Sequence, residues 1–172
     1  SNCVYPICKP ALSIQGVMAL LWEGSGTNGG KALHLKAQRN IADLSIYSTS
    51  VANNGGGSDG IEFTLPSISV SEGDDILLAR ETATLASYFG TCINSFEYVI
   101  ETSSLNQNGD DAIELYQGND VIETYGDVIP DGTGEPWEYT GSWAYKLNGN
   151  WVNGALDCAA GSTSTQSSAC MY

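Results

Sequence analysis

The sequence has few basic residues. Six lysines and arginines stand against 20 acidic residues, which gives a net charge of −14 at neutral pH. Proteins that bind nucleic acid hold its phosphates mainly with lysine and arginine. The sequence also lacks an apolar run of about 18 residues, the length that a membrane-spanning helix needs. We therefore expect neither nucleic acid nor membrane insertion among the functions of this chain.

Histidine is scarcer still, with one copy at His34. Hydrolases and nucleases usually use a histidine as general base or a cluster of metal ligands. Carboxylate pairs of the kind that glycosidases use occur in any acidic chain, so they identify no site by themselves. We therefore expect a protein that is not an enzyme and that has no cofactor. A second hypothesis is that the chain binds Ca²⁺.

Cysteines are present but badly spaced for a zinc site. Such sites use pairs about two to four residues apart, and the closest pair here, Cys3 and Cys8, is wider. Disulfides in an oxidising compartment fit better, which predicts a secreted or cell-surface protein. Because five is an odd number, at least one thiol is free or bonded outside this sequence, and 15 pairings stay open. The five candidates are Cys3, Cys8, Cys92, Cys158 and Cys170.

What the sequence has in abundance is the pattern of short strands and tight turns. Lys31 to Lys36 alternates, which places Leu33 and Leu35 on one face of a strand and His34 on the other. Turns rich in Gly, Asn and Asp separate such runs. The interval from Glu81 to Tyr88 is the one predicted helix. Strands are predicted at 12–22, 31–36, 41–47, 61–70, 76–79, 96–100, 112–116, 121–125 and 143–147, with a short one near Trp151.

Many short strands at close spacing predict an all-β sandwich or barrel in a single domain. We expect a Cys- and Pro-rich segment at 1–11, a β-sandwich with one short helix at 12–158, and a Ser/Thr-rich tail or linker at 159–172. The two ends share the pattern Cys-x-Tyr. Such ends are consistent with a repeating array of domains.

Five segments, in the same order along the chain, carry a resemblance. Residues 23–36 (E-G-S-G-T-N-G-G-K-A-L-H-L-K) and 41–47 (I-A-D-L-S-I-Y) come first, and residues 76–80 (I-L-L-A-R) follow. Residues 105–126 contain N-G-D-D-A-I-E-L-Y, and residues 131–146 run from D-G-T-G-E-P-W to W-A-Y-K. Over residues 14–157 the chain resembles the lamin-tail-like domain family. His34 stands where that family often has Glu, and Lys146 stands where it has Arg. These two departures make the resemblance less close, but they do not affect the function that it implies.

The resemblance implies an immunoglobulin-like β-sandwich without catalytic machinery. Domains of this kind occur in nuclear lamins, beside secreted bacterial nucleases and in large surface proteins. We therefore expect a structural module of an extracellular fibre, surface layer or adhesin, whose partners are copies of itself or neighbouring domains. It would assemble through terminal segments and edge strands. The alternative is a glycan- or Ca²⁺-binding accessory module of a secreted hydrolase or nuclease.

Three sets of residues are candidate sites. Oxygen-rich clusters suit Ca²⁺, although the same residues also make turns. Aromatic side chains could stack on a glycan or form an interface, although they also fill cores. A basic group on an acidic protein could contact a second copy, although a solvated strand face is the simpler interpretation. The sets are Asp110, Asp111, Asp127, Asp131 and Glu135 for Ca²⁺; Trp137, Tyr139, Trp143 and Trp151 for the aromatic surface; and Lys31, His34, Lys36 and Arg39 for the basic patch.

Overall fold

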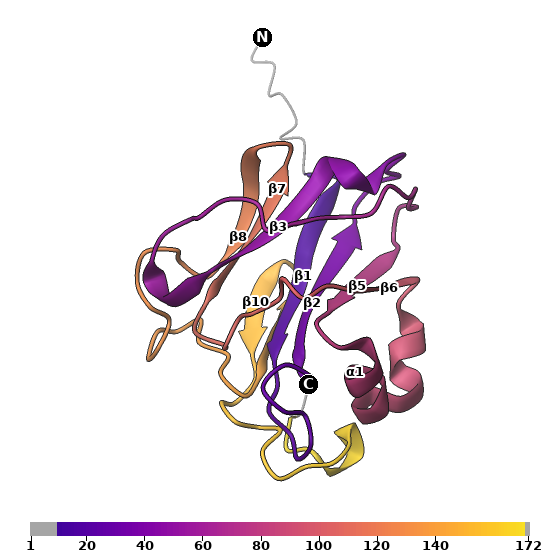
Figure 1. The fold of residues 1–172 in the computed structure, drawn as a ribbon. Helices are drawn as coiled ribbons and strands as arrows, with labels where there is room; N and C mark the ends of the chain where they lie inside the picture. Colours follow the sequence, from indigo (N-terminus) through magenta and orange to yellow (C-terminus); the bar gives the residue numbers. More distant parts are fainter. Residues whose placement is uncertain (1–9, 171–172) are drawn as a thin grey trace.

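Two β-sheets pack face to face in this computed structural model, which describes residues 10–170 (Figure 1). The large sheet has the order β10-β9-β1-β2-β5-β6, and the small sheet has the order β4-β3-β7-β8. The predicted all-β sandwich with one short helix is confirmed. The large sheet consists of β1 (Leu12–Ala19), β2 (Lys31–Ala37), β5 (Asp75–Ala79), β6 (Tyr98–Glu101), β9 (Trp143–Leu147) and β10 (Asn150–Asn153). The small sheet consists of β3 (Tyr47–Ala52), β4 (Phe63–Thr64), β7 (Ala112–Gln117) and β8 (Asp120–Tyr125).

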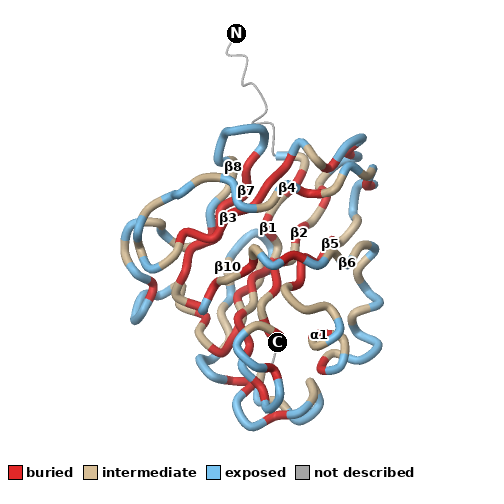
Figure 2. Tube along the Cα trace, viewed as in Figure 1, coloured by how far each residue is buried: buried red, intermediate tan, exposed pale blue. Residues whose placement is uncertain are grey.

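The main core fills the space between the sheets, where the buried residues gather (Figure 2). Leu33 and Leu35 of β2 are fully buried there, as the alternation predicts. His34 and Lys36 lie on the opposite side of β2, which we call the outer face of the large sheet because it is turned away from the small sheet. A second, smaller core covers part of this outer face.

A β-bulge in β1 decides which of its residues reach the outer face. The register of β1 against β2 shifts between Ile14 and Gly16, so Ile14 and Val17 both point into the main core. The carboxylate of Glu123 on β8 accepts the backbone N–H of Ile14 at 2.7 Å and pairs with Lys146. This contact ties the bulge to the small sheet. Beyond the bulge, Gly16 and Met18 lie on the outer face.

The predicted helix at 81–88 is confirmed as α1 (Thr82–Phe89), followed by the 3-10 helix η3 (Gly90–Ser95). Together they connect β5 to β6, which pairs with β5 in parallel. Parallel neighbours require such a crossover connection. Leu85 and Tyr88 of α1 pack on the outer face of the large sheet, where the Tyr88 ring stacks on Trp22 at 4.1 Å between centroids.

Two predicted strands are wrong in their extent. The segment 41–47 makes an isolated bridge between Ile41 and Val70 and then a 3-10 turn, η1 (Leu44–Ile46). The side chain of Asp43 accepts the N–H of Ser45 and so caps this turn. The segment 61–70 contains only the two-residue β4.

Strand β3 (Tyr47–Ala52) is not predicted from the sequence. It begins at Tyr47 and runs through Ser48, Thr49 and Ser50, all of them buried. The chain after the 3-10 helix η2 (Asn53–Gly55) covers it. The hydroxyl of Ser48 donates to Thr64 at 3.1 Å, and that of Ser50 donates to Asp59 at 3.3 Å. Small polar side chains are tolerated here because the covering loop satisfies their hydrogen bonds.

The predicted linker at 159–172 is part of the folded body as far as Cys170. A disulfide joins Cys158 to Cys170, and a short 3-10 helix, η4 (Thr165–Ser167), lies between them. Ala159 and Ser162 are buried, and the Ser162 carbonyl accepts the N–H of Glu23 at 2.9 Å. A Ser/Thr-rich composition is typical of linkers, but the disulfide and these contacts fix this segment on the domain.

Among the described cysteines, Cys92 is exposed and unpaired. Cys3 and Cys8 lie outside the described residues. The described chain begins at the upper end of the sandwich in Figure 1 and finishes at its lower end, beside α1. In residues 10–170 no helix combines the length and apolar character that crossing a membrane demands.

Candidate functional site: an apolar cavity on the outer face of the large sheet

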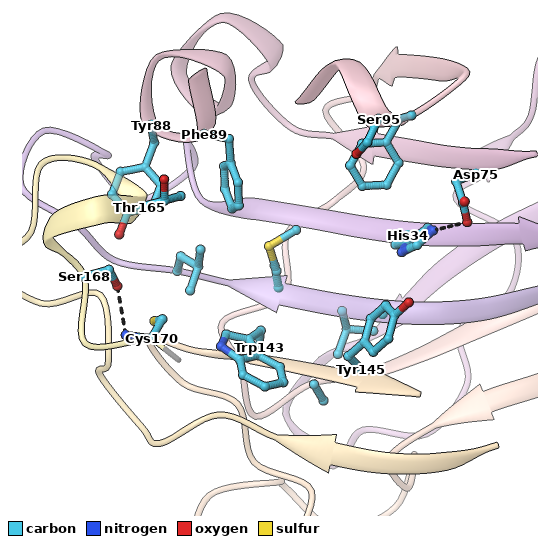
Figure 3. A pocket seen from close by; sticks show the side chains of 16 residues that line it. His34, Asp75, Tyr88, Phe89, Ser95, Trp143, Tyr145, Thr165, Ser168 and Cys170 are labelled. Carbon is cyan, nitrogen blue, oxygen red and sulfur yellow. Dashed lines mark hydrogen bonds and ion pairs between the residues drawn. The ribbon is translucent and has the colours of Figure 1, made fainter. Parts of the chain in front are cut away.

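A cavity of about 450 Å³ lies on the outer face of the large sheet. Strands β1, β2 and β9 form its floor, α1 and η3 form one side, and the segment that contains η4 forms another. Figure 3 shows Tyr88 and Phe89 above the strands and Trp143 and Tyr145 below them. We call it the outer-face cavity. Its apolar lining includes Met18, Leu20, Phe89, Phe96, Trp143 and Tyr145.

Gly16 makes the room for this cavity. In the strand registers Gly16 stands opposite His34 on β2 and opposite Tyr145 on β9. A Cβ atom on residue 16 would lie 3.2 Å from Cδ2 of Tyr145 and 3.3 Å from the carbonyl oxygen of Ala144. The rings of His34 and Tyr145 are therefore separated by a glycine, with 6.0 Å between their centroids.

His34 and Asp75 form the polar end of the cavity. The Nε2 atom of His34 lies 2.8 Å from Oδ1 of Asp75, and Lys36 donates to both oxygens of the same carboxylate at 2.8 and 2.9 Å. The ring of Phe96 meets His34 edge-on, with 4.9 Å between centroids. This end of the cavity thus holds two cationic or potentially cationic groups around one carboxylate.

The environment keeps His34 neutral and Asp75 ionised. Burial lowers the pKa of the His34 imidazole and outweighs the hydrogen bond to Asp75, which acts in the opposite direction. Burial alone would raise the pKa of Asp75, but the hydrogen bonds from Lys36 and His34 outweigh it and hold that pKa below its ordinary value. The charge of Asp75 is therefore balanced by Lys36, and the cavity presents an uncharged imidazole.

The segment closed by the disulfide supplies the remaining wall. Cys170, Ser168 and Thr165 line the cavity, and the hydroxyl of Ser168 accepts the N–H of Cys170 at 3.0 Å. The Oγ1 atom of Thr165 is buried and has no hydrogen-bond partner within residues 10–170. Buried polar atoms usually have a partner, so this wall offers one group that a bound molecule could satisfy.

A hydrolytic role would require a nucleophile beside His34. Ser95 lines the cavity, but its hydroxyl donates to the carbonyl of Cys92 at 2.8 Å. The chain also contains Gly-Gly-Ser-Asp-Gly at 56–60, which matches the nucleophile-elbow pattern. That pattern requires a strand-to-helix turn, whereas Ser58 lies in the loop between η2 and β4, within 2.9 Å of the hydroxyl of Tyr116.

Three of the five predicted Ca²⁺ ligands, Asp111, Asp127 and Asp131, accept backbone N–H groups in the structure. Asp111 is fully buried, and its two carboxylate oxygens accept the N–H groups of Asn54 and Asn108, both at 2.8 Å. Asp127 and Asp131 each accept an N–H two residues further on. Turn formation is thus the interpretation that the geometry favours. Glu135 is exposed, and Asp110 accepts the hydroxyl of Thr133. No group of three or more His, Cys, Asp or Glu side chains within residues 10–170 is placed to hold a metal ion.

The four predicted surface aromatics do not form one surface. They lie in a cavity, in a separate cleft and in the core. Trp143 lines the outer-face cavity, whereas Trp137 and Trp151 line a second, open cleft of about 760 Å³. Tyr139 is fully buried, and its hydroxyl donates to the carbonyl of Asp111 at 3.0 Å. Its burial removes Tyr139 from the predicted aromatic surface.

Trp137 attaches its loop to the sandwich. A Cβ atom on Gly126 or Gly132 would lie within 2.7 or 2.4 Å of the indole ring, so both glycines make room for it. The ring also meets Tyr125 edge-on. The interpretation that Trp137 packs the long loop onto the sandwich is consistent with these contacts.

The predicted basic patch is divided between two faces. His34 and Lys36 share Asp75 on the outer face. The Nζ atom of Lys31 instead donates to the carbonyl of Asn106 at 2.9 Å. Arg39 lies beyond the end of β2, in the following loop. The strand alternation that the sequence predicts is itself the reason, because Lys31 and His34 have opposite phase.

No sequence signal marks the outer-face cavity, since its lining comes from segments between residues 16 and 170. The predicted residues that lie in it are His34, Trp143 and Cys170, each singled out for another reason. No protein-family model, no curated protein and no solved structure matches this chain, so the resemblance to the lamin-tail-like domain family stays a prediction.

Proposed function

We propose that this chain is a non-catalytic extracellular module that binds an apolar, uncharged group of a neighbouring molecule in the outer-face cavity. The observation that carries the proposal is an apolar hollow of about 450 Å³ in which the lining carboxylate, Asp75, is already paired with Lys36. Hollows of this size, apolar with a few fixed polar groups, are typical binding sites. The disulfide between Cys158 and Cys170 is compatible with an extracellular setting.

The chemistry of the cavity favours binding over reaction. His34 donates to the ionised carboxylate of Asp75, which also accepts two hydrogen bonds from Lys36. A charged ligand would have to leave water for an apolar lining that offers no free counter-charge. Burial of an ion in a protein costs on the order of several kcal/mol. An aliphatic or aromatic group with a hydroxyl or amide at its tip would instead bury its apolar part. Its tip could bond His34 or Thr165.

The experiment is a titration of the oxidised protein with N-phenyl-1-naphthylamine, an uncharged dye whose fluorescence rises in apolar surroundings. We expect saturable binding to the unmodified chain. Ser95 is exposed and lines the cavity, so Ser95→Trp should block it and reduce dye affinity at least tenfold. Ser71→Trp is the matched control, since Ser71 is an exposed residue in the turn before β5.

Equal dye affinity in the unmodified chain and in Ser95→Trp would contradict the proposal, as would the absence of saturable binding. Far-UV circular dichroism of both variants checks that each one is folded. Reduced affinity in Ser71→Trp as well would show that the dye binds elsewhere, which also counts against the cavity.

A second candidate function rests on the open cleft. Trp137 and Trp151 line it together with the exposed carboxylates of Asp127 and Glu135. Indole rings beside hydrogen-bonding groups suit a glycan, whose pyranose faces are apolar and whose edges are hydroxyls. A glycan array with the full chain tests this. Binding that Trp151→Ala abolishes and Trp143→Ala leaves unchanged would favour it, and a flat array would remove it.

A further inference from the structure

Two hydroxyl groups that line the outer-face cavity already use their hydrogen atoms within the protein. The hydroxyl of Ser95 donates to the carbonyl of Cys92 at 2.8 Å, and that of Ser168 donates to the carbonyl of Cys158 at 3.3 Å. A hydroxyl has one hydrogen and two lone pairs. Toward the cavity, both serines therefore keep only the capacity to accept a hydrogen bond.

The imidazole of His34 provides a third acceptor, at an atom that Asp75 selects. An ionised carboxylate only accepts, so the hydrogen of the neutral ring is on Nε2, which lies 2.8 Å from Oδ1 of Asp75. The other ring nitrogen, Nδ1, is then an acceptor. It has no hydrogen-bond partner within residues 10–170, and Figure 3 shows it turned away from Asp75.

The surroundings of His34 limit the access of water to Nδ1. The ring of Phe96 meets the imidazole edge-on with 4.9 Å between centroids, and the ring of Tyr145 lies 6.0 Å away. Only 12% of the His34 side chain is exposed. A molecule that covers this end of the cavity must either donate to Nδ1 or leave a buried acceptor without a partner, which is unfavourable.

The polar groups lie at the two ends of the cavity, with apolar surface between them. Figure 3 shows His34 and Ser95 toward one end, Thr165 and Ser168 toward the other, and the rings of Phe89 and Trp143 in between. The lining therefore suits a molecule with an apolar body that carries a hydrogen-bond donor at the end near His34.

We infer that the outer-face cavity selects uncharged molecules that donate a hydrogen bond to Nδ1 of His34, such as an alcohol or phenol with an apolar body. This inference rests on the proposed function and names the ligand class of the same site. An ether of the same shape would bring its lone pairs against the lone pair of Nδ1. A carboxylate has no hydrogen to donate at neutral pH and would also bury a charge.

Three probes with one naphthalene body test this selection. 2-Naphthol is an uncharged donor at neutral pH, 2-methoxynaphthalene replaces its hydroxyl hydrogen with a methyl group, and 2-naphthoate is a carboxylate. Each competes with N-phenyl-1-naphthylamine for the oxidised full chain. We expect 2-naphthol to bind at least tenfold more tightly than either analogue, because a site that hydrogen-bonds a hydroxyl rejects an analogue without it. Apolar burial alone would instead favour the ether, which has the larger apolar surface.

Removal of the acceptor should remove the preference. His34→Phe keeps a flat ring but has no Nδ1, and Lys36 still pairs with Asp75. In this variant the ratio of the two affinities should reverse, so that the ether binds more tightly than 2-naphthol. Ser71→Ala is the control, since Ser71 is exposed in the turn before β5, and it should keep the preference of the unmodified chain. Far-UV circular dichroism checks that both variants are folded.

Nuclear magnetic resonance of the unmodified chain gives a test that needs no variant. His34 is the one histidine of the sequence, so nitrogen-15-labelled histidine produces a single pair of ring signals. We expect a protonated Nε2 and an unprotonated Nδ1 in the free protein. Saturation with 2-naphthol should shift the Nδ1 signal, whereas saturation with 2-methoxynaphthalene should leave it close to its free position.

The outcomes separate this inference from the proposed function. The inference is overturned if the ether or 2-naphthoate binds as tightly as 2-naphthol, or if 2-naphthol leaves the Nδ1 signal unchanged. Should the dye still bind the unmodified chain and bind Ser95→Trp weakly, the proposed function stands in that case, with an apolar ligand that makes no hydrogen bond to His34. If the dye itself shows no saturable binding, both claims fail.

Discussion

The imidazole of His34 lies 2.8 Å from the carboxylate of Asp75, yet burial keeps that imidazole neutral. An ion pair between the two would be stronger in Coulombic terms, but the apolar surroundings of His34 make the charged ring costly. The pair therefore behaves as a neutral donor held by an anion. Its protonation is linked to folding, which leads to the first prediction.

Acidification should destabilise the fold as the pH falls below about 6.5, the ordinary pKa of histidine, toward the lowered pKa of His34 in the folded chain. The folded-state pKa of His34 is below its unfolded value of about 6.5. The unfolded chain therefore takes up the proton first, and stability falls as the pH drops from 6.5 through the lowered folded value. Because His34 is the one histidine of the chain, urea unfolding of the unmodified protein and of His34→Asn isolates its effect. A similar pH slope in both proteins would show that His34 is not responsible.

Enlargement of residue 16 should reduce the cavity in steps. Gly16→Ala places a Cβ against Tyr145 and the Ala144 carbonyl, and Gly16→Val adds two methyl groups there. Overpacking costs about 1–3 kcal/mol, so we expect a small loss of stability for alanine and a larger one for valine. Dye affinity should decrease in the same order. Undiminished affinity in Gly16→Val would mean that the floor of the cavity is not where the dye binds.

Removal of the Glu123 carboxylate should loosen the bulge in β1. Glu123→Ala leaves the Ile14 N–H without its acceptor and removes the partner of Lys146. A buried group left unsatisfied costs about 1–3 kcal/mol. Glu123→Gln keeps an acceptor and should lose less. Chemical denaturation measures both against Glu72→Ala, an exposed carboxylate in the turn before β5, which should change stability little.

Loss of the Cys158–Cys170 disulfide should affect both stability and the cavity. The bridge spans 12 residues, and a loop of this size contributes about 3 kcal/mol in the chain-entropy model. Paired substitution to serine should lower the thermal midpoint and weaken dye binding, because the wall with Thr165 and Ser168 is no longer fixed. A lower midpoint with full dye affinity would show that this wall is dispensable for binding.

The sequence predicted local structure where the pattern of side chains within a single segment is sufficient to define it. The alternation around His34 predicted both faces of β2, and the helix at 81–88 was predicted by the absence of turn residues. It was uninformative where tertiary contacts decide. β3 contains Ser48 and Ser50, which no strand pattern favours until a covering loop satisfies them.

The cavity was beyond prediction for a related reason. Gly16 opens it only because the register puts His34 on one side and Tyr145 on the other. Such a register is set by a bulge whose partner, Glu123, is far away in sequence. The remaining wall depends on the Cys158–Cys170 bond, one of the ten pairs that five cysteines can form, which spacing alone could not single out.

The disulfide between Cys158 and Cys170 also determines when the last wall of the outer-face cavity can form during synthesis. The floor strand β1 is synthesised first and Cys170 last among the residues that line the cavity. A nascent chain can thus build its sandwich while Leu20 and Trp22 still lack their final cover, and it needs an oxidant to finish. The wall of the cavity that contains Cys170 is therefore completed only after residue 170 has been synthesised and its thiol oxidised.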